Sequence, residues 1–183
     1  MSHYLRDYTR LNRMRVLGID PGSRVTGFGV IDVERNRVVY VASGCVRAVA
    51  ASFPLRLKII FEGVSEIVNQ YRPDEMAIEK VFVQRNVDSA LKLGQARGAA
   101  LCAAIAQSIT IFEYSPTAIK QAVVGRGRAE KMQVQHMVKM LLGLEGTPPT
   151  DAADALACAL CHYHTNKTAQ YLSSPANRQG SRL

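Results

Sequence analysis

Four acidic residues stand where a carboxylate can take part in chemistry. Asp20 ends the apolar run VLGI, and Glu79 ends the run MAI. A carboxylate at the end of a buried strand loses hydration, which proteins seldom accept without a compensating partner. Asp151 and Asp154 begin the apolar string DAADALACAL and, being three positions apart, share one face of a helix. If the ends of the first and fourth strands are neighbours, the four carboxylates converge at one edge of a sheet.

Carboxylates gathered in this way repel one another unless cations lie among them. Ligand sets made only of oxygen select hard ions, and Mg²⁺ typically takes one or two carboxylates together with waters and phosphate oxygens. Two Mg²⁺ ions about 3.5–4 Å apart activate a water and stabilise the leaving oxygen in an in-line attack on a phosphodiester. The pattern therefore predicts metal-dependent phosphodiester hydrolysis, with two Mg²⁺ ions per subunit and with Mn²⁺ able to substitute.

Each acid taken singly also has an ordinary structural explanation. Asp20 precedes a Pro-Gly pair and can hold a turn. Asp151 or Asp154 can stabilise the N-terminus of the helix that it begins. The four acids in this order are more specific than any one of them, so we favour catalysis.

The charge balance favours an anionic partner. The chain has 23 Lys and Arg against 15 Asp and Glu, a net charge of +8, and its pI of 9.6 exceeds the value of about 9 above which nucleic acid is a natural partner. Residues 1–13 contribute +2 and residues 165–183 contribute +3, which leaves +3 for residues 14–164. The basic residues of segment 120–131 indicate a loop that contacts phosphates. The alternative interpretation is an exposed connection without a binding role. These basic residues are Lys120, Arg126, Arg128 and Lys131.

The order of strand-like and helical patterns predicts a mixed α/β sheet. Strand-like runs cover residues 15–20, 24–33, 37–46, 76–79 and 108–113. Helical patterns cover about residues 57–71, 87–107, 132–142 and 150–164, with a further helical stretch that opens at Pro116. Three antiparallel strands followed by alternating helices and strands indicate the α/β class, with a five-stranded mixed sheet and helices on both faces.

The length of 183 residues suits one domain with a hydrophobic core. We assign residues 14–164 to this domain and residues 1–13 to an N-terminal extension that is expected to be disordered. Residues 165–183, which contain three basic residues and no acid, are assigned to a disordered basic tail.

No apolar stretch predicts a membrane segment. The longest, residues 99–106, is far shorter than the roughly 18 residues of a membrane span. Residues 16–19, behind the N-terminal arginines, are fewer than the roughly 7–15 residues of a signal-peptide core. We therefore expect a cytoplasmic protein without membrane contact, whose four cysteines are reduced thiols.

Five motifs between Met14 and His164 resemble the RuvC-type Holliday junction resolvases. They are GIDPGSRVTGFGV, MAIEKVFV, NVDSALKLGQARGAA, VVGRGRAEKMQVQHMV and DAADALA. The resemblance implies a ribonuclease H-like fold and a homodimer. It also implies Mg²⁺-dependent nicking of opposed strands at a four-way DNA junction, in recombination and repair, together with the branch-migration proteins RuvA and RuvB.

The resemblance also assigns roles to residues. It implies that the metal ligands are Asp20, Glu79, Asp151 and Asp154. Phe82 matches an aromatic residue that the family places against junction bases, although a core position in a β-like segment is the plainer interpretation. Lys120 and Lys131 match basic residues at the rim of the family's active site, where a cation holds the scissile phosphate or stabilises its developing charge. An ordinary surface lysine is the plainer interpretation of each. We add Arg126 and Arg128 as DNA contacts, because they lie in the same basic loop.

Three other functions compete with this one. The opening motif is also similar to the first phosphate-binding motif of actin-like ATPases and sugar kinases, but those proteins need two such domains. The YqgF-type resolvase-like group is closer, and the helix around residues 91–98 and Phe82 argue against it. A junction-binding protein that does not cut has no use for four acids, because each weakens binding to a phosphate backbone when metal is absent.

Residues 158–162 spell C-x-x-C-H, the pattern of c-type haem attachment. Because the motif continues the apolar stripe of a helix, we interpret Cys158 and Cys161 as small core residues. Zinc bound through His162 or His164 is the alternative.

Gly94 and Gly98 lie in a helix of small residues and allow another helix to approach closely. That helix belongs either to a second subunit or to the same subunit, and the sequence leaves both open. A dimer with two-fold symmetry would match a four-way junction, which is itself nearly two-fold symmetric.

Overall fold

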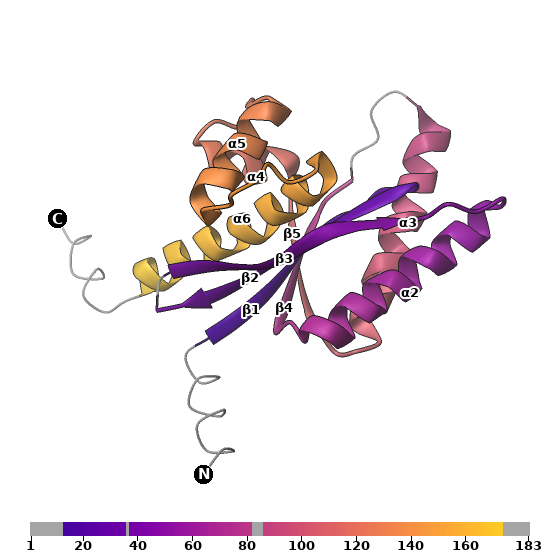
Figure 1. Ribbon diagram of the computed structural model, residues 1–183, viewed down its shortest axis with the longest axis horizontal. Coiled ribbons are helices and arrows are strands. Elements are labelled where there is room, and N and C mark those ends of the chain that lie inside the picture. Colours follow the sequence, from indigo (N-terminus) through magenta and orange to yellow (C-terminus); the bar gives the residue numbers. More distant parts are fainter. Residues whose placement is uncertain (1–12, 36, 82–85, 174–183) are drawn as a thin grey trace, which may run out of the picture.

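Five strands form one mixed sheet, and helices cover both of its faces (Figure 1). The computed structural model describes residues 13–35, 37–81 and 86–173. The strands are β1 (Arg13–Asp20), β2 (Val25–Glu34), β3 (Arg37–Arg47), β4 (Glu75–Glu79) and β5 (Thr110–Tyr114). Their order across the sheet is β3-β2-β1-β4-β5. The predicted α/β class and the mixed five-stranded sheet are confirmed.

The helices are α2 (Phe53–Tyr71), α3 (Val87–Ile105), α4 (Pro116–Val124), α5 (Lys131–Leu142) and α6 (Thr150–Ser173). Helices α2 and α3 lie on one side of the sheet, and α4, α5 and α6 lie on the other (Figure 1). In the described part of the chain, no helix combines the length and the apolar character needed to cross a membrane.

The direction of the strands brings distant parts of the chain to one edge. The first three strands are antiparallel neighbours, as predicted, whereas β1 runs parallel to β4 and β4 runs parallel to β5. The carboxyl ends of β1, β4 and β5 therefore meet at the same edge of the sheet. In mixed and parallel sheets of this kind, that edge is where ligands usually bind.

Two hydrophobic cores follow from the alternation of side chains along the strands. Val16 of β1 and Ala77 of β4 face the core shared with α4, α5 and α6. Leu17 and Met76, the neighbouring residues in the sequence, face the core shared with α2 and α3. All four residues have 0% exposure, so the central strands are buried on both sides.

Several boundaries differ from the predicted ones, among them those of α2, α6 and β1. Helix α2 begins at Phe53 rather than near residue 57, because proline is well suited to the first turn of a helix and Pro54 lies there. Helix α6 reaches Ser173 rather than ending near residue 164, so residues 165–173, which we assigned to the tail, continue the helix. No Gly or Pro interrupts the sequence before Pro175. Arg13, which we placed in the extension, is the first residue of β1.

Candidate active site

The first two acids lie at the ends of neighbouring strands. Ile19 pairs with Ile78 in the parallel register of β1 and β4. The next residue is Asp20 on β1 and Glu79 on β4. Adjacent strands lie about 4.8 Å apart, so the two backbones bring these carboxyl groups close together. The expectation that the ends of the first and fourth strands are adjacent is confirmed.

Helix α6 brings the other two acids to the same edge. Asp151 and Asp154 lie in its first two turns, and the helix packs directly on β1 and β2. A Cβ atom added at Gly27 would lie 2.0 Å from the Asp151 carbonyl oxygen, and one added at Gly18 would lie 2.0 Å from the Ala155 carbonyl oxygen. Only glycine permits this approach, and a glycine inside a strand is the sequence signal for it.

The pKa values show that the four carboxylates sense one another. Burial, followed by the negative charges of Asp154, Glu79 and Asp151, raises the pKa of Asp20 to about 8. The pKa of Glu79 is raised by burial and then by Asp154. Burial also raises the pKa of Asp154, and Asp151 adds to the effect. Acids on three separate elements therefore form one electrostatic cluster.

Both predicted lysines lie beside this cluster. Lys131, the first residue of α5, places its Nζ atom 3.9 Å from Asp154 Oδ2. It lowers the pKa values of Asp20, Glu79 and Asp154, in opposition to burial. Lys120 on α4 acts in the same direction on Glu79 and Asp154. The lysine side chain of residue 131 is 76% exposed, so the ion pair adds little to stability and leaves the cation accessible.

The other predicted contacts are placed differently. Arg126 and Arg128 are exposed in the connection between α4 and α5. Among the described residues, neither forms an ion pair, and neither is among the main causes of the pKa shifts in the acidic cluster. Phe82 lies outside the described residues.

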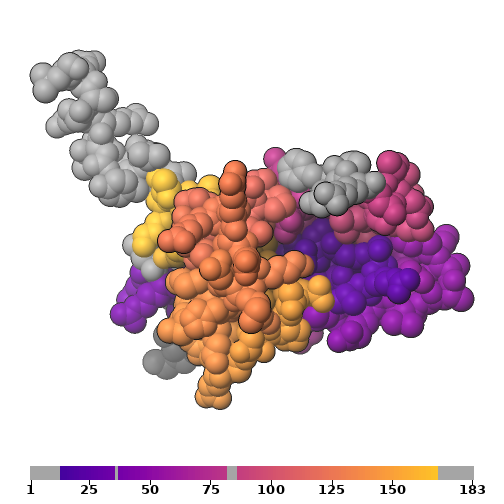
Figure 2. All heavy atoms as spheres, turned by 90° about the horizontal axis from the view of Figure 1, so that it is seen from above, coloured from indigo at the N-terminus to yellow at the C-terminus, as the bar shows by residue number. Residues whose placement is uncertain are grey.

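A cavity of about 490 Å³ opens beside Asp20 and Glu79. Its lining also includes Lys80, Asn86 and Ser89, which the sequence analysis did not single out. The Asn86 side chain accepts a hydrogen bond from the Ser89 backbone N–H (3.1 Å) and caps α3. Its sequence signal is that of a helix cap, which does not reveal that the cap lies next to an acidic cluster. Figure 2 shows the end of β1 and the start of β2, in indigo, reaching the surface beside the orange residues of α5.

Arg97 is a further residue that the sequence analysis did not single out. Its Nε atom donates a hydrogen bond to the Glu79 carbonyl oxygen (3.2 Å), and its guanidinium pairs with Glu113 at 2.6 Å. It thereby fixes the end of β4 where the Glu79 side chain emerges. No spacing rule indicates this contact, because it joins α3 to two strands.

The donor set fits a hard divalent cation. Among the described residues, no three Asp, Glu, His or Cys side chains are already close enough to enclose a metal ion. The acids are nevertheless close enough that burial and mutual repulsion raise the pKa values of three of them. A doubly charged cation would remove the repulsion that raises these pKa values. Binding therefore requires side chains of the cluster to turn towards the ion.

The C-x-x-C-H residues form part of the core. Cys158 and Cys161 are buried in the cluster on the α6 side of the sheet. His162 has 0% exposure, and its ring nitrogens form hydrogen bonds with Tyr114 (2.7 Å) and Glu75 (2.5 Å). These contacts fit the interpretation of the cysteines as small core residues.

The strand order and the parallel β1–β4 pair define a protein of the ribonuclease H-like class, with helices on both faces of the sheet. A family model described as crossover junction endodeoxyribonuclease RuvC matches residues 16–162, and the chain belongs to this family. Members of the family are nucleases, and membership implies a dependence on divalent metal in general.

Similar proteins match over nearly their whole length. The crossover junction endodeoxyribonuclease RuvC of Shewanella piezotolerans is 59% identical over 162 residues, which are 88% of this chain and 94% of that relative. The RuvC structure from Thermus thermophilus is 35% identical, with a TM-score of 0.77 over 85% of this chain and 97% of that one. The same RuvC in complex with a Holliday junction substrate gives a TM-score of 0.79, with 35% identity over 85% of this chain and 96% of that one.

Proposed function

We propose that this protein is a structure-selective endonuclease that resolves four-way DNA junctions in recombination and repair. It makes two symmetric nicks by metal-dependent hydrolysis of phosphodiesters. The observation that carries the proposal is the acidic cluster, in which carboxylates from β1, β4 and α6 meet at the carboxyl edge of the sheet beside an open cavity. The T. thermophilus relative in complex with a Holliday junction supports the choice of substrate.

The four acids of the cluster are the proposed ligands of two Mg²⁺ ions, for which Mn²⁺ substitutes. When bound, the ions supply an activated water and stabilise the leaving oxygen. Lys131 stands at the edge of the cluster with an exposed ammonium group, where it attracts the scissile phosphate and offsets its growing negative charge. Lys120 adds a second positive charge on the same side.

A homodimer is proposed to form through the outward face of α3. A Cβ atom at Gly94 or Gly98 would meet nothing within 4 Å, so these glycines are not used for packing inside the subunit. Val87, Leu91 and Ile105 continue the same stripe, and each is more than 60% exposed. The spacing of the stripe alternates between four and three residues where it begins, as in helices that pair along one face. Of the two arrangements left open by the sequence, this geometry favours contact with a second subunit.

The remaining assignments rest on the family resemblance and on the sequence. Phe82 is proposed to stack on junction bases, and Arg126 and Arg128 are proposed to contact DNA phosphates from the basic loop. RuvA and RuvB are the proposed protein partners, and the cytoplasm is the proposed location. The proposed nuclease domain contains residues 14–164 and, because β1 begins at Arg13 and α6 reaches Ser173, also Arg13 and residues 165–173.

The decisive variant is Asp20→Asn, which keeps the shape of the side chain and removes its charge. We expect Mg²⁺-dependent nicking of a synthetic four-way junction to fall by roughly 10³-fold or more, the scale on which a main electrostatic contributor to catalysis acts. Junction binding without metal should persist, because the variant removes a negative charge from a surface that meets phosphates. The measurement is gel-resolved cleavage beside a binding isotherm.

Glu62→Gln provides the matched control. Glu62 is an exposed acid on α2 whose partner is Lys58 at 3.6 Å, so this isosteric change should leave cleavage unaltered. Cleavage by Asp20→Asn at the rate of the wild type would refute the metal-ligand role. Junction binding without cleavage by the wild type in Mg²⁺ or Mn²⁺ would instead favour the binding protein that does not cut.

A further inference from the structure

Basic side chains lead across the surface of the protein, away from the cavity beside Asp20 and Glu79, which we call the catalytic cavity. A second cavity, of about 410 Å³, shares Ser89 with the catalytic one. A third cavity, of about 180 Å³, shares Arg24 and Arg56 with the second. The three cavities therefore adjoin one another in sequence along the surface. We call the basic residues that line its second and third cavities the basic track: Lys92, Arg24, Arg56 and Arg47.

The described residues neutralise the positive charge of the basic track only in part. Asp88 is the one acid in the described lining of the second cavity, and it pairs with Lys92 at 2.6 Å. Arg24 lies exposed in the turn between β1 and β2 and forms no ion pair with any described residue. Arg56 donates its Nε proton to the Ala50 carbonyl oxygen (3.2 Å), which orients the guanidinium.

The helix that begins at the second cavity adds to this preference for anions. Helix α2 starts with Phe53, which lines the cavity. The N-cap residue, Ser52, makes no side-chain capping hydrogen bond, and the first turn contains no acid. The backbone N–H groups of that turn and the dipole of the helix are therefore available to an anion. Helix α3 differs, because Asn86 caps it and its first turn carries an acid.

We propose that the basic track binds the sugar-phosphate backbone of the DNA strand as it leaves the catalytic cavity. A single anion would fill one cavity, whereas a chain of phosphodiesters suits cationic cavities that follow one another. Arg24 lies four positions after Asp20 in the turn that leaves β1. A phosphate held by Arg24 is therefore tied by a short piece of backbone to a metal ligand, which sets how far the strand extends into the active site. This inference rests on the proposed function.

The test measures binding of a synthetic four-way junction to the full chain, without divalent metal, at several salt concentrations. We expect Arg24→Ala and Arg56→Ala each to weaken binding about tenfold, because each removes a charge-assisted hydrogen bond. The slope of log affinity against log salt should fall by about 0.9 for each phosphate that the variant no longer neutralises. Asp88→Asn should act in the opposite direction and tighten binding, because it removes the acid of the second cavity.

Lys58→Ala is the matched control, because it removes a positive charge from α2 at a position that lines none of the three cavities. It should leave the affinity and the slope unchanged. If Arg56→Ala fails to fold, Arg24→Ala decides alone, because its exposed turn position involves no packing. Arginine variants that bind and cut like Lys58→Ala would overturn the basic track and leave the proposed function intact. A wild type that fails to cut while its binding still depends on the arginines would contradict the nuclease instead.

Discussion

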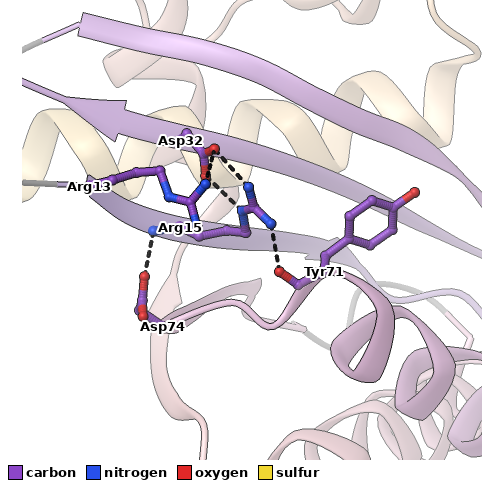
Figure 3. Close-up of polar contacts among 5 residues, drawn as sticks. All are labelled: Arg13, Arg15, Asp32, Tyr71 and Asp74. Carbon is purple, nitrogen blue, oxygen red and sulfur yellow. Dashed lines mark hydrogen bonds and ion pairs between the residues drawn. The ribbon is translucent and has the colours of Figure 1, made fainter. Parts of the chain in front are cut away.

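The two ends of β1 use charge in opposite ways. At the start of the strand, Arg15 forms hydrogen bonds with both carboxylate oxygens of Asp32 (2.7 and 2.8 Å), and Arg13 pairs with the same acid at 3.3 Å (Figure 3). The hydrogen bond to Asp32 raises the pKa of Arg15. At the other end of the strand, Asp20 stands among three more acids, and burial with their repulsion raises its pKa to about 8.

This contrast separates charge that holds the fold together from charge that we propose to serve catalysis. The paired end also ties the strand to its surroundings, because Arg15 donates to the Tyr71 carbonyl oxygen (2.8 Å) and its backbone N–H donates to Asp74 (2.7 Å). Within the described part of the chain, the four acids at the other end make one ion pair, between Asp154 and Lys131 at 3.9 Å. Their cluster therefore destabilises the protein while no cation is bound. Such perturbed acids in a cleft are typical of functional sites.

The largest effect on stability is expected at the paired end. Asp32→Ala should lower the free energy of unfolding by about 2–4 kcal/mol, because it leaves two arginines facing a nearly buried site with no anion. Asp32 is only 6% exposed, although Arg13 retains some contact with solvent. Urea denaturation would measure the change. Glu34→Gln, at the exposed end of β2, is the control. If Asp32→Ala lowered the free energy of unfolding no more than Glu34→Gln does, the ion pairs of Asp32 would not be needed for stability.

The opposite sign is expected at the acidic end. The folded-state pKa of Asp20 is about 8, above the value of about 3.9 expected for an unfolded aspartate. The folded state therefore binds the extra proton between these limits, and the stability of the metal-free protein falls as pH rises from about 4 to about 8. Asp20→Asn removes the contribution of this residue and should stabilise the metal-free protein by about 1–3 kcal/mol at pH 8.

The measurement is the melting temperature of the wild type and of Asp20→Asn between pH 4 and pH 9, with a chelator present. The difference between the two proteins should widen up to about pH 8 and then level off. A constant difference across this range would mean that Asp20 already titrates near its ordinary value. In that case the acids at the carboxyl edge of the sheet would not form one electrostatic cluster.

The same contrast explains what the sequence does and does not predict. The sequence predicts that Asp20 and Glu79 lie at the ends of strands, because each follows directly on an apolar run. The period of such a run and the place where it ends are local signals. The paired end was not predicted, because Arg15 and Asp32 meet only through the antiparallel register of β1 and β2. The basic track was missed for the same reason, since its residues come from separate elements. The extension of α6 was missed because a polar composition hid a helix that no Gly or Pro interrupts.

Metal binding should turn the acidic end of β1 from a destabilising into a stabilising part of the protein. Mg²⁺ at about 100 times its dissociation constant should stabilise the wild type by about 2.7 kcal/mol, and Asp20→Asn or Asp154→Asn should respond much less. Because Asp20 holds a proton below about pH 8, binding should also release protons. Calorimetry of the wild type in two buffers of different ionisation enthalpy would count them. Equal heats in both buffers would show that the carboxylates are ionised before the ion arrives.

The smallest effect on stability, and the sharpest test of the acidic end, is expected from Lys131→Ala. Its ion pair with Asp154 is 3.9 Å long and the lysine is largely exposed, so the free energy of unfolding should change by less than about 0.5 kcal/mol. Lys131 nevertheless lowers the pKa values of Asp20, Glu79 and Asp154. Its removal should raise them, so that the pH at which cleavage reaches half its maximum moves upwards. Lys58→Ala should move neither quantity. The opposite result would be a Lys131→Ala variant that is less stable but cleaves with an unchanged pH profile. Lys131 would then stabilise the fold, as the arginines at the other end of β1 do.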